Sequence, residues 1–181
     1  DRRSLLRLIV PTVPNLVHQT SWVVALLWIY PALASFLNKS SVLFAAMMAY
    51  ALFPEERWLF RSKRFIGGLT LSVIGTLGLA LLRPDLDKMQ INLGVLLVLV
   101  AAAAWAVYSV TAKRPAEEIG STISFPVVSI YTTLLLLPMA LAWGDLGHFR
   151  EVPWHVNAIM IVSGIVLIGL AHTAYFYAIK Q

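Results

Sequence analysis

A lysine and an asparagine stand inside a long apolar stretch of this chain. Asn38 and Lys39 interrupt the run ALASFLNKSSVLF at residues 32–44, and Ser40 and Ser41 follow them. A lysine within a membrane-spanning helix costs about 2.5–3.5 kcal/mol on insertion scales. The ammonium of Lys39 could bind an anionic or carbonyl group of a solute in a water-filled cavity. Alternatively, its four-carbon stem could carry the charge out to the lipid headgroups.

A second group of polar side chains lies near the end of the sequence, in GLAHTAYFYA at residues 169–178. His172 has Thr173 and Tyr175 close to it. An intramembrane histidine in such a setting could hydrogen-bond a solute or relay a proton. A neutral histidine bonded to a neighbouring helix explains the same pattern equally well.

Three residues of another apolar segment recur at spacings that place them on one helical face. Trp105, Tyr108 and Ser109 are three and four positions apart, and residues at these spacings are neighbours on a helix. They could form an aromatic wall of a cavity, or they could be packing residues. His18 lies in an earlier apolar run and is interpreted as a group that hydrogen-bonds a neighbouring helix.

The composition indicates which elements carry these side chains. The chain has 181 residues, of which 59% are hydrophobic and 13% charged, whereas soluble domains are about 45–50% apolar and about 25% charged. The apolar residues form runs of roughly 20, the length that crosses about 30 Å of hydrocarbon. We therefore expect an all-α, polytopic bundle of transmembrane helices rather than a β-barrel, whose segments are short and alternating.

The apolar runs predict six crossings. The first run, 13–53, is twice as long as one crossing. A turn at Asn38–Lys39 would leave a second helix of only about 21 Å, whereas Pro31 divides the run into two helices of sufficient length. Pro31 could instead kink one helix. The other predicted crossings lie at 65–82, 92–112, 121–143 and 156–179, and the loops between them at 54–64, 83–90, 113–118 and 144–154.

The basic residues predict the orientation of this bundle. If the loops alternate between the two sides, ten Lys and Arg residues fall on one side and four on the other, counting Lys39 with the turn. The positive-inside rule then places 1–10, 54–64, 113–118 and the C-terminal end in the cytoplasm. The net charge of +5 is explained in this way, so nucleic-acid binding is not expected.

No metal centre or cofactor is expected. The chain contains no cysteine, which excludes disulfides and thiolate metal sites. The four histidines are scattered, and no glycine-rich phosphate loop is present.

Three stretches resemble EamA-type members of the drug/metabolite transporter superfamily. They are ALLWIYPALASFLNKSSVLFAAMMAYALFPEERW (25–58), GVLLVLVAAAAWAVYSVTAKR (94–114) and GLAHTAYFYAIKQ (169–181). The resemblance implies a ten-helix fold of two inverted repeats. Residues 1–83 would be the C-terminal part of the first repeat and residues 84–181 the N-terminal part of the second, with three helices each. The chain would then be an internal fragment of a longer protein.

The resemblance also implies a function. A secondary transporter of this type would carry a small organic metabolite or drug-like solute across the cytoplasmic (inner) membrane, more often outward, by alternating access around a central cavity. The partners would be the solute and the lipid bilayer. Proton or ion coupling is left open, and the oligomeric state is not indicated.

The predicted solute-binding set combines the residues named above with Tyr30, which the repeat layout places at the same cavity as His172. The set is Tyr30, Asn38, Lys39, Trp105, Tyr108, Ser109, His172 and Tyr175. Two other classes of protein remain open. A non-transporting membrane scaffold or assembly subunit would use these polar residues to bond other helices. A membrane-embedded lipid enzyme is less favoured because no acid/base or metal group is clustered at one membrane face.

Overall fold

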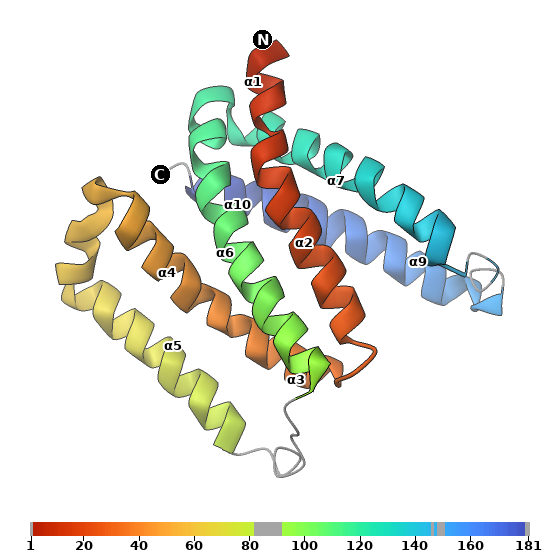
Figure 1. Cartoon of the computed structure of the whole chain (residues 1–181), viewed down its shortest axis with the longest axis horizontal. Coiled ribbons are helices and arrows are strands. Elements are labelled where there is room, and N and C mark those ends of the chain that lie inside the picture. The colour runs from red at the N-terminus through yellow and green to blue at the C-terminus, as the bar shows by residue number, and fades with distance from the viewer. Residues whose placement is uncertain (1, 82–91, 146, 148–150, 180–181) are drawn as a thin grey trace. The chain divides into compact units, whose positions relative to one another are not determined.

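The computed structural model describes residues 2–81, 92–145, 147 and 151–179. These residues are almost entirely helical, and no strand occurs among them (Figure 1). The predicted all-α fold is therefore confirmed. The chain packs as two compact units: residues 1–16 and 111–181 form the first unit, and residues 17–110 form the second.

Two long helices contribute to both units, and the other elements belong to one unit each. The shared helices are α2 (Ile9–Ala25) and α6 (Leu93–Ile119). The first unit also holds α1 (Arg2–Arg7), α7 (Ser121–Trp143), α9 (Trp154–Ser163), the π-helix η4 (Gly164–Leu170) and α10 (Ala171–Ile179). The second unit also holds α3 (Pro31–Leu37), the 3₁₀-helix η1 (Asn38–Ser40), α4 (Ser41–Leu52), the 3₁₀-helix η2 (Pro54–Arg61) and α5 (Lys63–Leu81).

Four helices in the described part of the chain are long and apolar enough to span a membrane. They are Pro31–Leu52, Leu93–Ile119, Thr122–Trp143 and Trp154–Tyr175, and they correspond to four of the six predicted crossings. α5 has the length of a fifth, at 19 residues. The predicted polytopic membrane protein is confirmed. The predicted loop at 83–90 lies outside the described residues.

The structure places the first turn at Pro31, as the sequence predicts. Tyr30 is extended, with φ −65° and ψ 141°, and Pro31 begins α3. The missing N–H of a proline has no partner to lose at the first position of a helix. The helix then runs through η1 to Leu52, so Asn38 and Lys39 lie within it and not in a turn.

The predicted first crossing, 13–30, is wrong at both ends. α2 covers 17 residues, Ile9–Ala25, or about 26 Å. Beyond Ala25 the backbone tightens, because the N–H groups of Leu26 and Leu27 bond carbonyls three residues earlier, at Val23 and Val24. Such i−3 bonds end the α-helical ladder before the turn is reached.

The predicted loop at 113–118 is also wrong. α6 continues through Pro115 to Ile119, and the chain reverses at Gly120, whose φ of 94° suits a residue without Cβ. The hydroxyl of Ser124 donates to the carbonyls of Gly120 (2.8 Å) and Pro115 (3.2 Å). These bonds tie the end of α6 to the first turn of α7.

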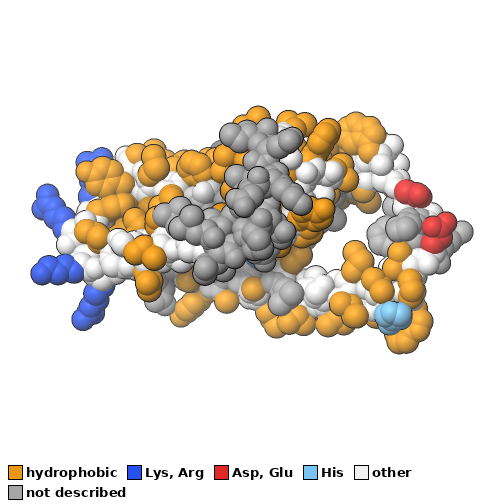
Figure 2. All heavy atoms as spheres, turned by 90° about the horizontal axis from the view of Figure 1, so that it is seen from below, with side chains coloured by type: hydrophobic (Ala, Val, Ile, Leu, Met, Phe, Trp, Pro, Cys, Tyr) orange, Lys and Arg blue, Asp and Glu red, His pale blue; other side chains and the backbone are white. Residues whose placement is uncertain are grey.

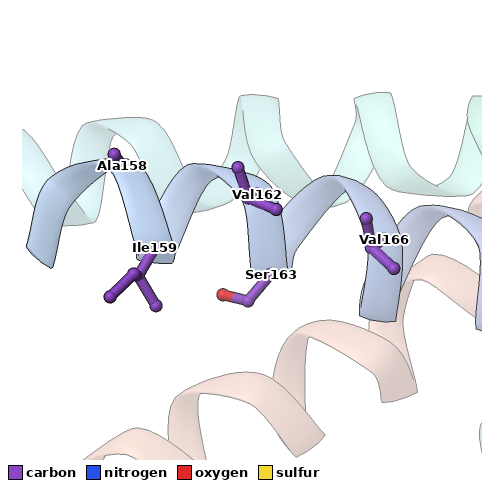
Figure 3. Close-up of a pocket in the computed structure, with 5 residues that line it drawn as sticks. All are labelled: Ala158, Ile159, Val162, Ser163 and Val166. Carbon is purple, nitrogen blue, oxygen red and sulfur yellow. The ribbon is translucent and has the colours of Figure 1, made fainter. Parts of the chain in front are cut away.

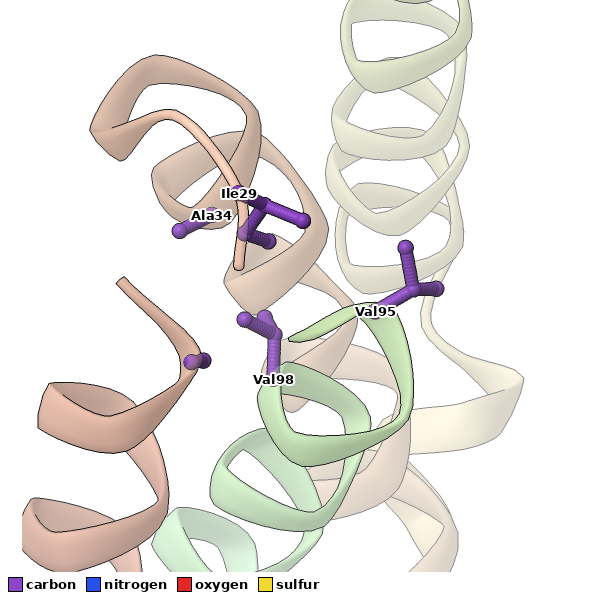
Figure 4. Close-up of a cluster of buried hydrophobic side chains, with 5 residues drawn as sticks. Ile29, Ala34, Val95 and Val98 are labelled. Atoms are coloured by element: carbon purple, nitrogen blue, oxygen red, sulfur yellow. The ribbon is translucent and has the colours of Figure 1, made fainter. Parts of the chain in front are cut away.

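The core of the second unit lies where α2, α3 and α6 meet. Ala25, Ile29, Ala34, Val95 and Val98 form a buried cluster there, and Figure 4 shows the last four on the chain segments that form it. The backbones approach closely at this point. A Cβ added to Gly94 would lie 2.7 Å from Cβ of Trp28 and 2.8 Å from Cγ2 of Ile29. Glycine is therefore required sterically at position 94.

Small residues continue along α6 and bring α2 close to it. Ala101, Ala102 and Ala106 are fully buried, as is typical of contacts between membrane helices. His18 on α2 lies 2.9 Å from the Ala101 carbonyl through Nδ1. Because a carbonyl only accepts, Nδ1 carries the proton and donates. The helix-to-helix role predicted for His18 is thus confirmed.

A similar polar bond joins α2 to α7 within the first unit. The Asn15 amide donates to the Thr132 hydroxyl at 2.9 Å, and that hydroxyl donates to the Val128 carbonyl at 2.8 Å. Both side chains are buried. At the end of the same unit, Arg7 and Glu118 form an exposed ion pair of 2.8 Å, and such exposed pairs contribute little stability.

Apolar side chains cover much of the described surface. In the most apolar part of the helix Trp154–Tyr175, no residue is buried. In the most apolar part of Pro31–Leu52, only 6% of the residues are buried. On the face drawn in Figure 2, hydrophobic side chains dominate, and Lys and Arg project from the end where η2 joins α4 to α5. Exposed apolar patches of this extent mark membrane or protein contacts, and lipid is the contact that these spanning helices require.

We expect Gly94→Ala to lower the free energy of unfolding by about 1–3 kcal/mol, because the new Cβ overpacks the contact with Trp28 and Ile29. Unfolding of the purified protein in mixed micelles measures the change. Gly75→Ala is the matched control. Its Cβ would meet no atom within 4 Å, so alanine should be neutral or stabilising by up to about 1 kcal/mol. Equal stability of the two variants would contradict the packing described.

We expect His18→Leu to destabilise the protein by about 0.6 kcal/mol, and by at most about 2 kcal/mol, the range measured for hydrogen bonds between membrane helices. The same unfolding measurement applies. Ser163→Ala removes a hydroxyl that donates only to the Met160 carbonyl of its own helix, and it should cost less. A His18→Leu protein as stable as the native one would show that the bond to α6 contributes nothing.

Candidate solute-binding site

Lys39 lies about 12 Å along the helix from its start at Pro31, at 1.5 Å per residue. The side chain is exposed, so its ammonium is open to lipid headgroups, water or a solute. Lys39 belongs to η1, the one turn of this 22-residue helix that is 3₁₀ rather than α. A 3₁₀ stretch in the middle of a helix often marks a hinge or a functional position.

Asn38 carries an unusual polar atom. Its Oδ1 is buried and has no hydrogen-bond partner among the described residues. The neighbouring Ser40 is satisfied, because its hydroxyl donates to the Leu37 carbonyl at 2.7 Å. A buried acceptor without a donor costs about 1–3 kcal/mol. Asn38 and Lys39 therefore place an unused acceptor and a cation on adjacent residues of a membrane helix.

Tyr30 stands apart from this pair. It precedes the helix that carries Lys39, and 83% of its surface is exposed. Tyr30 is eight residues before Asn38 and nine before Lys39. It therefore lies at the end of the membrane helix and not at the level of these two residues. Tyr30 is therefore suited to the mouth of a cavity more than to its centre.

Trp105 and Tyr108 share a face, as the spacing predicts, and His18 joins them from α2. The ring centroids of Trp105 and Tyr108 are 5.1 Å apart, and those of His18 and Trp105 are 5.0 Å apart. Tyr108 is 1% exposed and Trp105 half-buried. Trp105 is thus the residue of this aromatic cluster that a solute could contact.

Ser109 completes the predicted face but directs its hydroxyl to the backbone. It donates to the Trp105 carbonyl at 2.7 Å. A serine bonded to the preceding turn often bends a membrane helix. In this conformation Ser109 acts on the backbone beside Trp105.

His172 lies on α10 against α7. Its ring stacks on Phe125, with the centroids 5.4 Å apart and the planes at 22°, and its Nδ1 lies 3.1 Å from the Ile168 carbonyl. Since the carbonyl accepts, Nδ1 donates, which leaves Nε2 as the nitrogen that accepts in the neutral ring. Tyr175 is half-buried on the same helix, three residues further on.

The segment before His172 is a π-helix. Gly164–Leu170 has this hydrogen-bonding pattern between α9 and α10. π-Helical turns are rare in proteins, and those that occur are often found at functional sites. The insertion rotates α10 relative to α9, so it determines which face of α10 carries His172. No feature of the sequence predicts it.

A groove of about 420 Å³ lies on the same long helix but not at His172. Ala158, Ile159, Val162, Ser163 and Val166 line it, and Figure 3 shows all five on α9 and the start of η4. The lining is almost wholly apolar. None of the predicted solute-binding residues lines this groove, so it suits a lipid chain better than a polar solute.

The structure brings the predicted residues together in three places. Asn38 and Lys39 are adjacent on η1. Trp105, Tyr108 and Ser109 share one face of α6, and His172 and Tyr175 share α10. His18 and Phe125 join two of these groups without having been placed in the predicted set. Their partners lie on other helices, so spacing along one run carries no signal of the contact.

Comparison with known families identifies the second half of the chain. Residues 92–181 match the model of the EamA-like transporter family. Comparisons with curated proteins and with solved structures give no match. The match spans α6, α7, α9 and α10. These elements include three of the four described helices that are suited to span a membrane, because α9 and the start of α10 belong to one continuous helix, Trp154–Tyr175. Residues 92–181 are therefore similar to the EamA-like transporter family, as the motifs of the sequence predict.

Proposed function

We propose that this protein is a secondary transporter that moves a small organic solute across the inner membrane by alternating access, and that it exports the solute. The family match over residues 92–181 carries the proposal. A family match of this kind supports the class of protein, a transporter. The solute and the direction of transport must be determined by experiment. Under this proposal residues 1–83 and 84–181 are parts of two inverted repeats, with further helices outside this chain.

The polar residues in the membrane helices support a solute site. Lys39 supplies a fixed positive charge, and Asn38 beside it supplies an acceptor with no donor among the described residues. A charge and an unsatisfied acceptor both lose free energy in hydrocarbon. A solute with an anionic group would pair with the exposed ammonium of Lys39, which is the physical reason to place it there.

The aromatic residues would shape the rest of the site. Trp105 is the half-buried edge of the His18–Trp105–Tyr108 cluster and offers a flat apolar surface. Tyr30 would stand at the mouth, and Tyr108 and Ser109 would support Trp105. In the first unit, described by itself, Phe125 and the Ile168 carbonyl orient the ring of His172, with Tyr175 on the same helix, and we propose these two residues as further contacts of a solute.

Coupling to protons would fall to His172. In the described membrane helices, Asp and Glu occur only at the end of α6, as Glu117 and Glu118, so the proposed proton carrier is His172 or a residue outside the described part of the chain. His18 is committed to the Ala101 carbonyl and to Trp105. The proposal includes no cofactor and no enzymatic step. Its cytoplasmic side is the one that carries 54–64 and the end of α6, by the positive-inside rule.

Lys39→Ala should abolish or strongly reduce solute movement. A hydrogen bond to a charged group contributes about 1.5–3 kcal/mol, so we expect at least about tenfold weaker transport at the same solute concentration. Metabolites of the medium and the cytosol are compared between cells that make the native full-length protein and cells that make the variant, at matched membrane levels.

The control is Arg114→Ala, which removes an exposed charge near the end of α6 and should leave transport unchanged. If Lys39→Ala transports as well as the native protein, Lys39 extends to the headgroups and is not part of the site. If the native protein shifts no solute between the compartments, the transporter proposal fails and the scaffold alternative is favoured.

A further inference from the structure

The segment that joins α4 to α5 is a short amphipathic helix in its own right. η2 covers eight residues, Pro54–Arg61, in a 3₁₀ conformation. Three residues complete one turn of such a helix, so side chains three apart lie above one another. Arg57 and Phe60 therefore share one face of η2, and Glu55, Trp58 and Arg61 share another.

The face with Arg57 and Phe60 is attached to the rest of the second unit. The Arg57 guanidinium lies 5.3 Å from the centroid of the Tyr50 ring, and its Nε donates to the Tyr50 carbonyl at 3.0 Å. The Phe60 ring packs edge-on against Tyr50 at 5.0 Å and against Phe65 at 4.9 Å. These contacts hold η2 in one orientation between the ends of α4 and α5.

The face with Trp58 and Arg61 is left exposed. Trp58 is 66% exposed, and Arg61 is exposed one turn further along. Lys63 and Arg64 are exposed directly after η2, in the first turn of α5. Within the described part of the chain, none of these three cationic side chains pairs with a carboxylate.

The charges of this segment are separated along the chain. Its two acidic residues, Glu55 and Glu56, stand at the start of η2, and three of its four basic residues stand at the end or just beyond. Glu55 and Arg61 are six residues apart, or about 12 Å along a 3₁₀ axis. That distance exceeds a Debye length at physiological salt. Glu55 at the start of η2 is therefore too far along the axis to neutralise Arg61 at its end.

We propose that Arg61, Lys63 and Arg64, with Trp58, form a binding surface for the headgroups of anionic phospholipids. Three observations carry this inference: the cations are exposed and unpaired among the described residues, a tryptophan projects beside them, and the segment connects two membrane helices. Basic residues at a membrane surface attract anionic lipid by about fivefold in affinity for each residue. Tryptophan prefers the same depth.

A lipid fits this surface better than a soluble anion does. A soluble ligand would gain nothing from Trp58, whereas the indole of a lipid-bound segment enters the interface beside the phosphate groups. The inward face of η2 is fixed by Tyr50, so the outward face meets the headgroup layer without rearrangement. The inference needs only a membrane-embedded chain and is independent of whether the protein transports a solute.

Quenching by brominated lipid tests the proposal. Ser62→Cys in a cysteine-free form of the full-length protein is labelled with a fluorophore, and the protein is reconstituted in vesicles of phosphatidylcholine and phosphatidylglycerol in equal amounts. Either one lipid or the other is brominated. We expect brominated phosphatidylglycerol to quench at least about fivefold more effectively than brominated phosphatidylcholine. Equal quenching by the two lipids would overturn the proposal.

Substitutions then locate the preference. Arg61→Gln with Arg64→Gln should abolish it, whereas Arg61→Lys with Arg64→Lys should retain it and shows that the protein still folds. Lys113→Gln with Arg114→Gln removes the same charge elsewhere and should leave the preference intact. The assignment would be overturned if the preference for phosphatidylglycerol survives Arg61→Gln with Arg64→Gln. It would also be overturned if Lys113→Gln with Arg114→Gln reduces the preference to the same extent. Loss of the preference on addition of inorganic phosphate, at an ionic strength matched with chloride, would overturn it too and would identify a site for a soluble anion.

Discussion

The structure depends on the need of each backbone N–H and C=O in hydrocarbon for a partner within the protein. Helices meet that need along their length, so the informative places are those where the α-helical ladder is interrupted. Pro31, Gly120, the 3₁₀ turn η1 and the π-helix η4 are such places. At Gly120, the N–H groups of Ile123 and Ser124 donate to its carbonyl. At η1, the Ser40 hydroxyl donates to the Leu37 carbonyl.

The same constraint explains how the helices associate. Lipid tails are as apolar as leucine, so hydrophobicity alone does not hold one membrane helix to another. Close approach does, and here it rests on small residues: Gly94 and the alanines of α6. Single polar bonds add to it, from His18 to α6 in one unit and from Asn15 to Thr132 in the other. Polar residues in membrane helices thus serve structure as well as function.

Lys39 differs from these polar residues because no described residue pairs with it. His18 and Asn15 each have a partner on another helix, whereas Lys39 is exposed and Asn38 next to it has an acceptor without a donor among the described residues. His172 is intermediate, since Phe125 and the Ile168 carbonyl orient its ring and one nitrogen remains an acceptor. This contrast between satisfied and unsatisfied polar groups supports Lys39 as the proposed contact of a solute.

The sequence by itself determined the all-α membrane class, the turn at Pro31, the position of Lys39 within a helix and the similarity of residues 92–181 to the EamA-like family. These depend on local quantities: run length, the missing N–H of proline and motif order. The extension of α6 through Pro115, the end of α2 at Ala25, the π-helix and the contacts of His18 and Phe125 were decided only by the tertiary structure. Each depends on a hydrogen bond or a packing partner that the apolar pattern of a single segment does not contain.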